Sequence, residues 1–166
     1  MALSDREVSD IIAYAQSMPS KDDVQPPTVL GPVGRMLVAT GKMPIAAEVI
    51  DHSVETVPLP PEVAVNAEYG SHIAQPCVGC HRLKFEGGPI AAGPPDWPPA
   101  PNLTQAGDLV NWSEEDFLKA MRTGQRPSAE PLNPQAMPWP VLGKMSELEL
   151  KAIWASLSSL EPVPTG

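Results

Sequence analysis

Cys77-Val78-Gly79-Cys80-His81 places two cysteines three positions apart and a histidine directly after the second. These are the only two cysteines in the chain. The spacing is the attachment signature of a c-type haem, in which both thiols add to the porphyrin vinyl groups and the imidazole binds the iron from one face. The sequence therefore predicts one covalently attached haem, held through Cys77 and Cys80, with His81 as an iron ligand.

Two other kinds of site use a closely spaced pair of cysteines. A thioredoxin-like redox pair lies at a helix N-terminus in a βαβ unit, whereas residues 67–74 show no strand alternation before the motif. A structural zinc site needs tetrahedral coordination by nitrogen and sulfur, usually with a second pair of ligands at comparable spacing. The other two histidines, His52 and His72, provide no such pair. Both alternatives are therefore disfavoured.

Length and composition indicate one ordinary domain plus an extension in these 166 residues. Hydrophobic residues make up 42%, which is enough for a core, but only 5% are aromatic and 22 residues are proline. Proline lacks the N–H that helices and central strands need, so much of the chain is expected in turns and extended loops. A haem would add the apolar core that the sequence lacks, and we expect the chain without it to be poorly folded.

The formal net charge of −9 argues against nucleic acid and anionic membrane surfaces as partners. No window approaches the ~20 apolar residues that a transmembrane helix needs. Residues 1–7 lack the basic and apolar segments of a secretory signal. Because c-type haems are normally attached outside an energy-transducing membrane, we expect the protein in the periplasm or at the outer face of the cytoplasmic membrane, with a leader or preceding region removed.

Capping residues and apolar periodicity predict an all-α fold with long proline-rich loops. The expected helices cover residues 4–17, 66–75, 113–123 and 146–160, with shorter helical segments at 33–40 and 45–50. The long loops cover residues 82–101 and 126–141. The order is therefore helix, haem motif, long loop, helix, loop, helix.

Residues 4–17 nearly repeat the start of the C-terminal helix. Both segments begin with Ser, carry Glu three positions later as in a capping box, and continue with an apolar stripe. Two interpretations stay open: any two capped amphipathic helices look alike, or residues 4–17 are the last helix of a preceding domain of the same kind. In the second case the stripe would contact that missing domain or a swapped second copy.

A histidine-ligated haem iron needs a sixth ligand, and the methionine thioether is a common one. Of the seven methionines, Met1, Met18, Met36 and Met43 precede the motif, Met121 lies on the apolar face of a predicted helix, and Met145 lies beside a helix cap. Met137 lies in a loop stiffened by flanking prolines, which can hold the sulfur in place at little ordering cost. We therefore expect Met137 as the sixth ligand. The alternatives are a methionine that only fills a gap, or ligation by His52 or His72.

Residues 66–161 resemble the class I cytochromes c. The matching segments are Cys77–His81, Pro101-Asn102-Leu103-Thr104, Arg122-Thr123-Gly124, Met137-Pro138-Trp139 and a C-terminal helix with Trp154. The chain is most similar to bacterial monohaem and dihaem cytochromes that serve periplasmic dehydrogenases and oxidases. The resemblance implies about three to five helices wrapped around one haem. It also implies that the first and last helices cross, with Gly70 and Ile73 meeting Ile153 and Trp154.

The same resemblance implies roles for loop residues. His81 and Met137 would be the axial ligands, and a proline carbonyl, mapped to Pro89, would orient the imidazole of His81. The residues that would line the haem propionates are Asn102, Thr104, Trp97 and Trp139. Each of these four could instead be a loop residue that satisfies its own backbone.

We expect an N-terminal extension over residues 1–65, a haem domain over 66–161 and a short tail over 162–166. The predicted function is one-electron transfer without substrate chemistry of its own, as a free carrier or as the cytochrome subunit or domain of a dehydrogenase or oxidase. The acidic surface favours redox partners with basic docking patches. The alternative is a haem enzyme or a gas or redox sensor with an open or exchangeable sixth position.

Overall fold

The computed structural model of the chain describes residues 3–20, 26–27, 29–45, 49, 53, 59–90, 93–94 and 96–166. Within these ranges the regular structure is helical, and β-pairing is limited to two isolated bridges, Gly88 with Ala100 and Gln125 with Pro131. The prediction of an all-α fold is confirmed. The chain divides into two compact units, Ala2–Leu59 and Pro60–Gly166.

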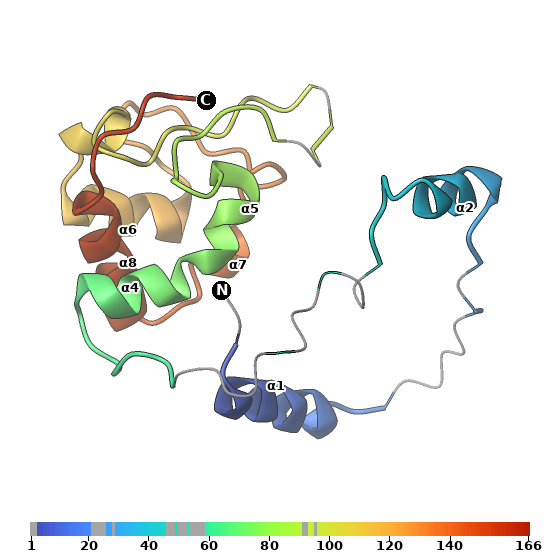
Figure 1. The fold of residues 1–166 in the computed structure, drawn as a ribbon. Helices are drawn as coiled ribbons and strands as arrows, with labels where there is room; N and C mark the ends of the chain where they lie inside the picture. The colour runs from blue at the N-terminus through green and yellow to red at the C-terminus, as the bar shows by residue number, and fades with distance from the viewer. Residues whose placement is uncertain are drawn as a thin grey trace. The chain divides into compact units, whose positions relative to one another are not determined.

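The first unit contains α1 (Asp5–Ser17) and α2 (Pro32–Ala39), close to the ranges expected from the sequence (Figure 1). α1 begins at the predicted capping box, in which the amide of Ser4 donates to the Glu7 carboxylate and the Ser4 hydroxyl oxygen accepts from the Glu7 amide. Neither helix contains a buried residue. The helical segment expected at 45–50 falls largely outside the described residues, and His52 lies outside them entirely.

The second unit begins with α4 (Ala67–Ile73), which the side chain of Asn66 caps by accepting from the Tyr69 amide. A short 3-10 turn, η1 (Gln75–Cys77), and one helical turn, α5 (Val78–His81), carry the cysteine and histidine motif. The remaining elements are η2 (Asp108–Asn111), α6 (Glu114–Thr123), α7 (Trp139–Leu142) and α8 (Glu147–Ser158). The motif therefore directly follows a capped helix, as the sequence predicts.

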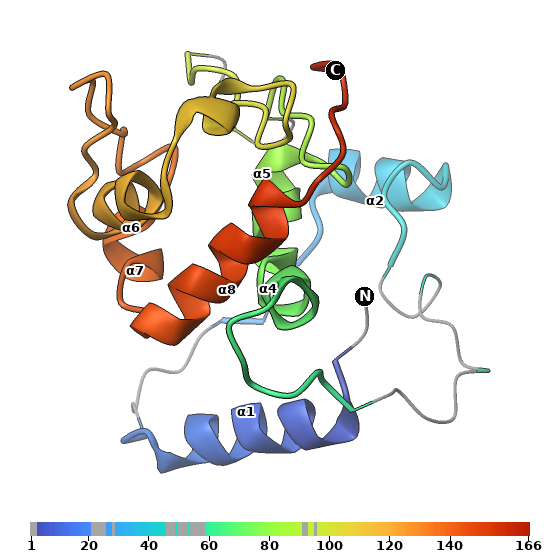
Figure 2. The ribbon, with the colours of Figure 1, turned by 90° about the vertical axis from the view of Figure 1, so that its left-hand side faces the viewer.

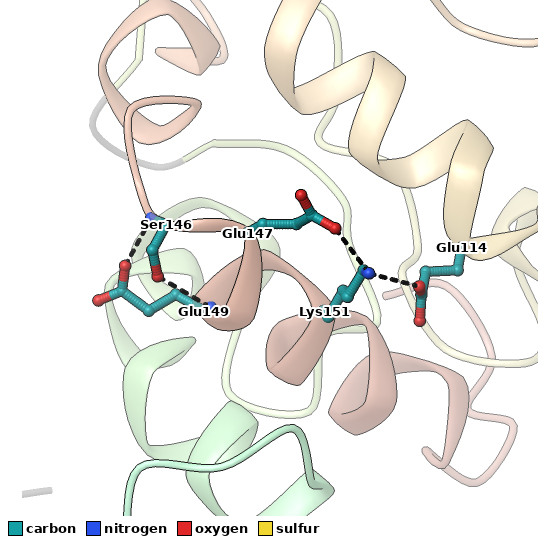
Figure 3. A network of polar contacts seen from close by, with 5 residues as sticks. All are labelled: Glu114, Ser146, Glu147, Glu149 and Lys151. Atoms are coloured by element: carbon teal, nitrogen blue, oxygen red, sulfur yellow. Dashed lines mark hydrogen bonds and ion pairs between the residues drawn. The ribbon is translucent and has the colours of Figure 1, made fainter.

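Both long helices of this unit begin with a capping box. Ser113 pairs with Asp116 at the start of α6, and Ser146 pairs with Glu149 at the start of α8 (Figure 3). α6 ends at Gly124, whose φ of 73° is the left-handed conformation typical of a helix C-terminus. The short helix α7 lies in a segment for which the sequence predicts only loop. Pro140 is tolerated there because a proline in the first turn removes no helical hydrogen bond.

α4 packs against α8, which lies beside it in both ribbon views (Figures 1 and 2). A Cβ atom added at Gly70 would lie 1.8 Å from the carbonyl oxygen of Ala152 and 3.0 Å from the Cβ of Ser156. Ala152 and Ser156 are one turn apart on the same face of α8, and both are buried. The expected crossing is present, and the atoms nearest to Gly70 belong to Ala152 and Ser156, two small residues that let the two backbones approach closely.

The core of the second unit is a cluster of buried apolar side chains around α6 and α8. Its members are Ala74, Phe85, Leu109, Phe117, Met121, Leu150, Ile153 and Leu157. The rings of Phe117 and Trp154 lie 5.6 Å apart and are tilted by 33°, which joins α6 to α8. The core thus fixes the two helices that form one wall of the site.

Candidate functional site

An apolar cavity lies between the haem motif, α6, α8 and the loop that carries Met137. It holds about 510 Å³ of empty space, including the open solvent at its mouth. Its walls are formed by Ile73, Pro76, Cys77, His81, Leu103, Phe117, Met121, Met137, Leu142, Met145, Ile153 and Leu157. Most of these side chains are hydrocarbon, so the cavity suits an apolar group.

The cavity brings together three of the residues predicted from the sequence. Cys77 comes from η1, His81 from α5 and Met137 from the loop before α7. All three line the same cavity. Cys77 and Cys80 are half-buried and are not joined in a disulfide. Burial and the neighbouring Cys80 thiol both raise the pKa of Cys77, so its sulfur is a thiol at neutral pH.

His81 is held in the protonation state that a metal ligand requires. Its side chain is 6% exposed, and its Nδ1 lies 2.9 Å from the carbonyl oxygen of Pro101. A carbonyl only accepts, so Nδ1 carries the proton and the Nε2 lone pair stays available. Burial lowers the pKa of His81 below its usual 6.5, and the bond to Pro101 opposes that shift only in part. The imidazole is therefore neutral at neutral pH, the form that coordinates iron.

The carbonyl that meets His81 belongs to Pro101, and the assignment to Pro89 is wrong. Pro89 is exposed. Backbone hydrogen bonds of 2.9 Å in both directions join Gly88 to Ala100, which closes the loop between them. This pairing brings the end of the loop back to its start. The residue that follows Ala100, Pro101, therefore lies against the imidazole of His81.

Gly87 allows the returning segment to come close to the motif. Its φ of 70° lies in the left-handed region, and an added Cβ would lie 2.5 Å from the Ala100 carbonyl oxygen and 2.6 Å from the carbonyl carbon of Pro101. The amide of Leu103 donates to the carbonyl of Phe85 at 2.8 Å on the other side of this contact. A side chain at position 87 would push Pro101 away from His81.

The four residues assigned to the propionates do not line the cavity, and their propionate role stays a prediction. Asn102 and Thr104 are buried and bond to each other and to the C-terminal tail. The Trp97 ring lies against Gly93. The indole Nε1 of Trp139 donates to the Leu132 carbonyl at 3.2 Å, and its ring lies against Gly124.

Three methionines reach the cavity, since Met121 and Met145 line it as well as Met137. Met121 is a buried member of the core cluster on α6, and Met145 directly precedes the cap of α8. The sequence placed Met121 on the apolar face of a helix and Met145 beside a helix cap, and it did not predict that either faces the site. The signal was available in the apolar face of the helix that carries Met121.

The two rival interpretations of the cysteine pair find no support. A thioredoxin-like pair needs a βαβ unit, whereas the described ranges contain only isolated bridges. A zinc site needs further ligands, and the described part of the chain contains no group of three or more His, Cys, Asp or Glu side chains that could hold a metal ion. A thiol, a neutral imidazole and a thioether around an apolar cavity instead fit a haem.

The fold and this donor set define a haem-binding protein of the electron-carrying kind. A family model described as cytochrome c matches residues 67–161, and the chain belongs to the cytochrome c family. Members of this family hold covalent haem c and transfer electrons through it, and the pair Cys77 and Cys80 fits their attachment motif. No curated protein matches the chain significantly. Among the helices described by the structure, none is long and apolar enough to cross a membrane.

Proposed function

We propose that the chain is a one-electron carrier with a single haem c attached through Cys77 and Cys80 and ligated by His81 and Met137. The observation that carries the proposal is the meeting of a neutral imidazole and a thioether in one apolar cavity, although they come from distant parts of the sequence. The bound haem supplies the Fe(III)/Fe(II) couple. With two protein ligands in place, little has to rearrange when an electron arrives or leaves.

His81 and the apolar walls would set the redox properties of the site. The bond between His81 Nδ1 and the Pro101 carbonyl fixes the tautomer and the orientation of the ring. The hydrocarbon side chains around it keep water out, and an apolar surrounding disfavours the more highly charged Fe(III) state. Thioether ligation acts in the same direction, so we expect a raised reduction potential.

Met137 is favoured over the other two cavity methionines because its loop is held in place independently of the core. Its amide donates to the Asn133 carbonyl at 2.8 Å, and the Trp139 amide donates to the Met137 carbonyl at 2.7 Å. The Asn133 side chain accepts from the Gln135 amide at 2.9 Å. These bonds hold the backbone on both sides of Met137, so its sulfur needs little further ordering to bind a metal.

The net charge of −9 supports redox partners with basic docking patches, and added salt would slow the encounter with them. Cytochrome c domains are often periplasmic or extracellular, which supports a place in the periplasm or at the outer face of the cytoplasmic membrane. In that setting the chain would act as a carrier or as the cytochrome subunit of a dehydrogenase or oxidase.

Carbon monoxide binding to the reduced holoprotein at neutral pH tests the proposal. We expect no binding by the wild type, because the sixth position is filled, and binding by Met137→Ala. Met145→Ala is the matched control, since it removes another cavity thioether, and it should stay closed to carbon monoxide. Binding by the wild type would contradict the proposal and favour an enzyme or sensor with an open sixth position.

A further inference from the structure

The chain that follows α8 is tied to the segment that carries Pro101. The side-chain amide of Asn102 donates to the Val163 carbonyl at 2.7 Å and to the Thr165 hydroxyl at 3.2 Å. The amide of Val163 donates to the hydroxyl oxygen of Thr104 at 3.1 Å. We call this group, formed by the side chains of Asn102 and Thr104 and the backbone of Val163, the tail clasp.

The tail clasp is a buried and satisfied polar network. Thr104 is fully buried and Asn102 is 6% exposed. The Asn102 Oδ1 accepts from the Thr104 amide at 2.8 Å and from the Thr104 hydroxyl at 2.7 Å, and the Ala106 amide donates to the same hydroxyl at 3.2 Å. Buried networks of this kind fix a backbone in one arrangement, because breaking any bond leaves a polar group unpaired.

The clasp lies next to the peptide group that bonds to His81. Pro101 precedes Asn102 directly, and on its other side Ala100 is paired with Gly88. The Pro101 carbonyl is therefore held between two anchored residues, one fixed by the bridge and the other by the tail. The path runs from the end of α8 (the red helix and tail in Figure 2) to the Nδ1 of His81.

The cytochrome c match ends at residue 161, so Val163 and Thr165 lie beyond it. We propose that Asn102, Thr104 and Val163 are positioning residues. They hold the Pro101 carbonyl against His81 Nδ1 and thereby set how strongly the imidazole donates to the iron. The proposal rests on the proposed role of His81 as the haem ligand. A hydrogen bond to the outer nitrogen raises the basicity of a ligating imidazole, so loosening this bond should favour Fe(II).

Two independent variants break the clasp in the holoprotein. Thr104→Val keeps the shape and removes the hydroxyl, and Thr104→Ser restores it. Val163→Pro removes one backbone N–H in the tail, outside the core, and Val163→Ala is its matched control. The readouts are the midpoint potential, the solvent exchange rate of the His81 Nδ1 proton followed by NMR in the reduced protein, and the unfolding temperature.

We expect Thr104→Val and Val163→Pro to raise the ratio of reduced to oxidised protein severalfold at a fixed ambient potential and to speed exchange of the Nδ1 proton. A tenfold change in that ratio corresponds to about 59 mV. Thr104→Ser and Val163→Ala should stay near the wild type. The Val163 pair carries the test on its own if Thr104→Val does not fold.

The proposal is overturned if the two variants lower the unfolding temperature but leave the potential and the exchange rate unchanged, because the clasp would then be only structural. Equal shifts in Val163→Pro and Val163→Ala would also overturn it, since the N–H would not matter. Failure of the proposed function would instead show in the wild type, as carbon monoxide binding.

Discussion

α1 and α8 begin with the same kind of cap, but the apolar face of α1 is exposed and that of α8 is buried. Each begins with a capping box in which the glutamate carboxylate accepts from the serine amide and the serine hydroxyl oxygen accepts from the glutamate amide. α8 buries its apolar face, with Leu150 fully buried and Ile153 4% exposed. In α1 the corresponding residues, Val8 and Ile11, are 41% and 54% exposed. Capping and periodicity are therefore enough to form a helix, but burial of its face needs a partner with a matching surface.

The two helices differ at the positions that make the close crossing in the haem domain. Ala152 and Ser156 of α8 admit the backbone of α4 at Gly70. When Ser4 is aligned with Ser146, the matching positions of α1 hold Asp10 and Tyr14, which are large or charged and exposed. The sequence repeat thus includes the capping residues and the apolar stripe, but not the small residues at the helix crossing. The origin of α1 in a preceding domain and its contact with a swapped second copy both stay predictions.

The largest expected difference comes from exchanging one crossing residue. Ala152→Asp should cost more than about 4 kcal/mol or prevent folding, because it puts an unpaired carboxylate against the backbone of α4. Asp10→Ala should change stability by less than about 0.5 kcal/mol, since Asp10 is exposed. Urea unfolding of the two holoproteins measures both. Similar effects at the two positions would show that α1 is buried in the same way as α8.

The apolar stripe should give the next largest difference. Leu150→Ala should cost about 2–5 kcal/mol, because Leu150 is fully buried in the core cluster. Val8→Ala should fall within about 0.5 kcal/mol, because the Val8 side chain is partly in solvent. The midpoints of denaturant curves for both variants provide the comparison. A large loss at Val8 would mean that a partner covers the stripe in solution.

The caps offer a finer test. Ser146→Ala should lower global stability by about 1 kcal/mol, since α8 is part of the cooperative core. Ser4→Ala removes the equivalent bond, but we expect only faster hydrogen exchange of the first α1 amides, without a change in global unfolding. A shared loss of global stability would show that α1 unfolds together with the haem domain.

The smallest effect belongs to Lys151, whose ammonium group lies 2.6 Å from Glu147 and 3.9 Å from Glu114 of α6 (Figure 3). The bond to Glu147 raises the pKa of Lys151, and the same bond lowers the pKa of Glu147. The contribution of Glu147 to stability is complete at pH values above its usual pKa of 4.5, and it is lost as the pH falls through the lowered pKa. The contribution of Lys151 to stability is complete at pH values below its usual pKa of 10.5, and it is lost as the pH rises through the raised pKa.

Lys151→Gln should therefore lower the unfolding temperature slightly at neutral pH and low salt, and the difference from wild type should vanish in high salt and in acid. In α1 the matching pair is Asp5 and Ser9, where the Ser9 hydroxyl donates to the Asp5 carbonyl instead. Ser9→Ala is thus a neutral control without a salt-dependent effect. A salt-independent loss in Lys151→Gln would point to packing by its hydrocarbon chain.

The sequence predicts those parts of the site that depend on the spacing of neighbouring residues. The motif at Cys77 to His81 and the loop that carries Met137 could both be predicted, and the structure brings their side chains to one cavity. Which proline returns to His81 could not be predicted, because it depends on how the loop closes between Gly88 and Ala100. The partners of Asn102 also lie far along the chain, at Val163. Contacts of that kind leave no periodic pattern in a single sequence.

The absorption spectrum of the oxidised holoprotein tests most directly whether Met137 is the sixth ligand. We expect a far-red methionine-to-iron band in the wild type and in Met145→Ala, and its loss in Met137→Ala. A band that persists in Met137→Ala would contradict ligation by Met137, because the sixth ligand would then be another residue of the cavity.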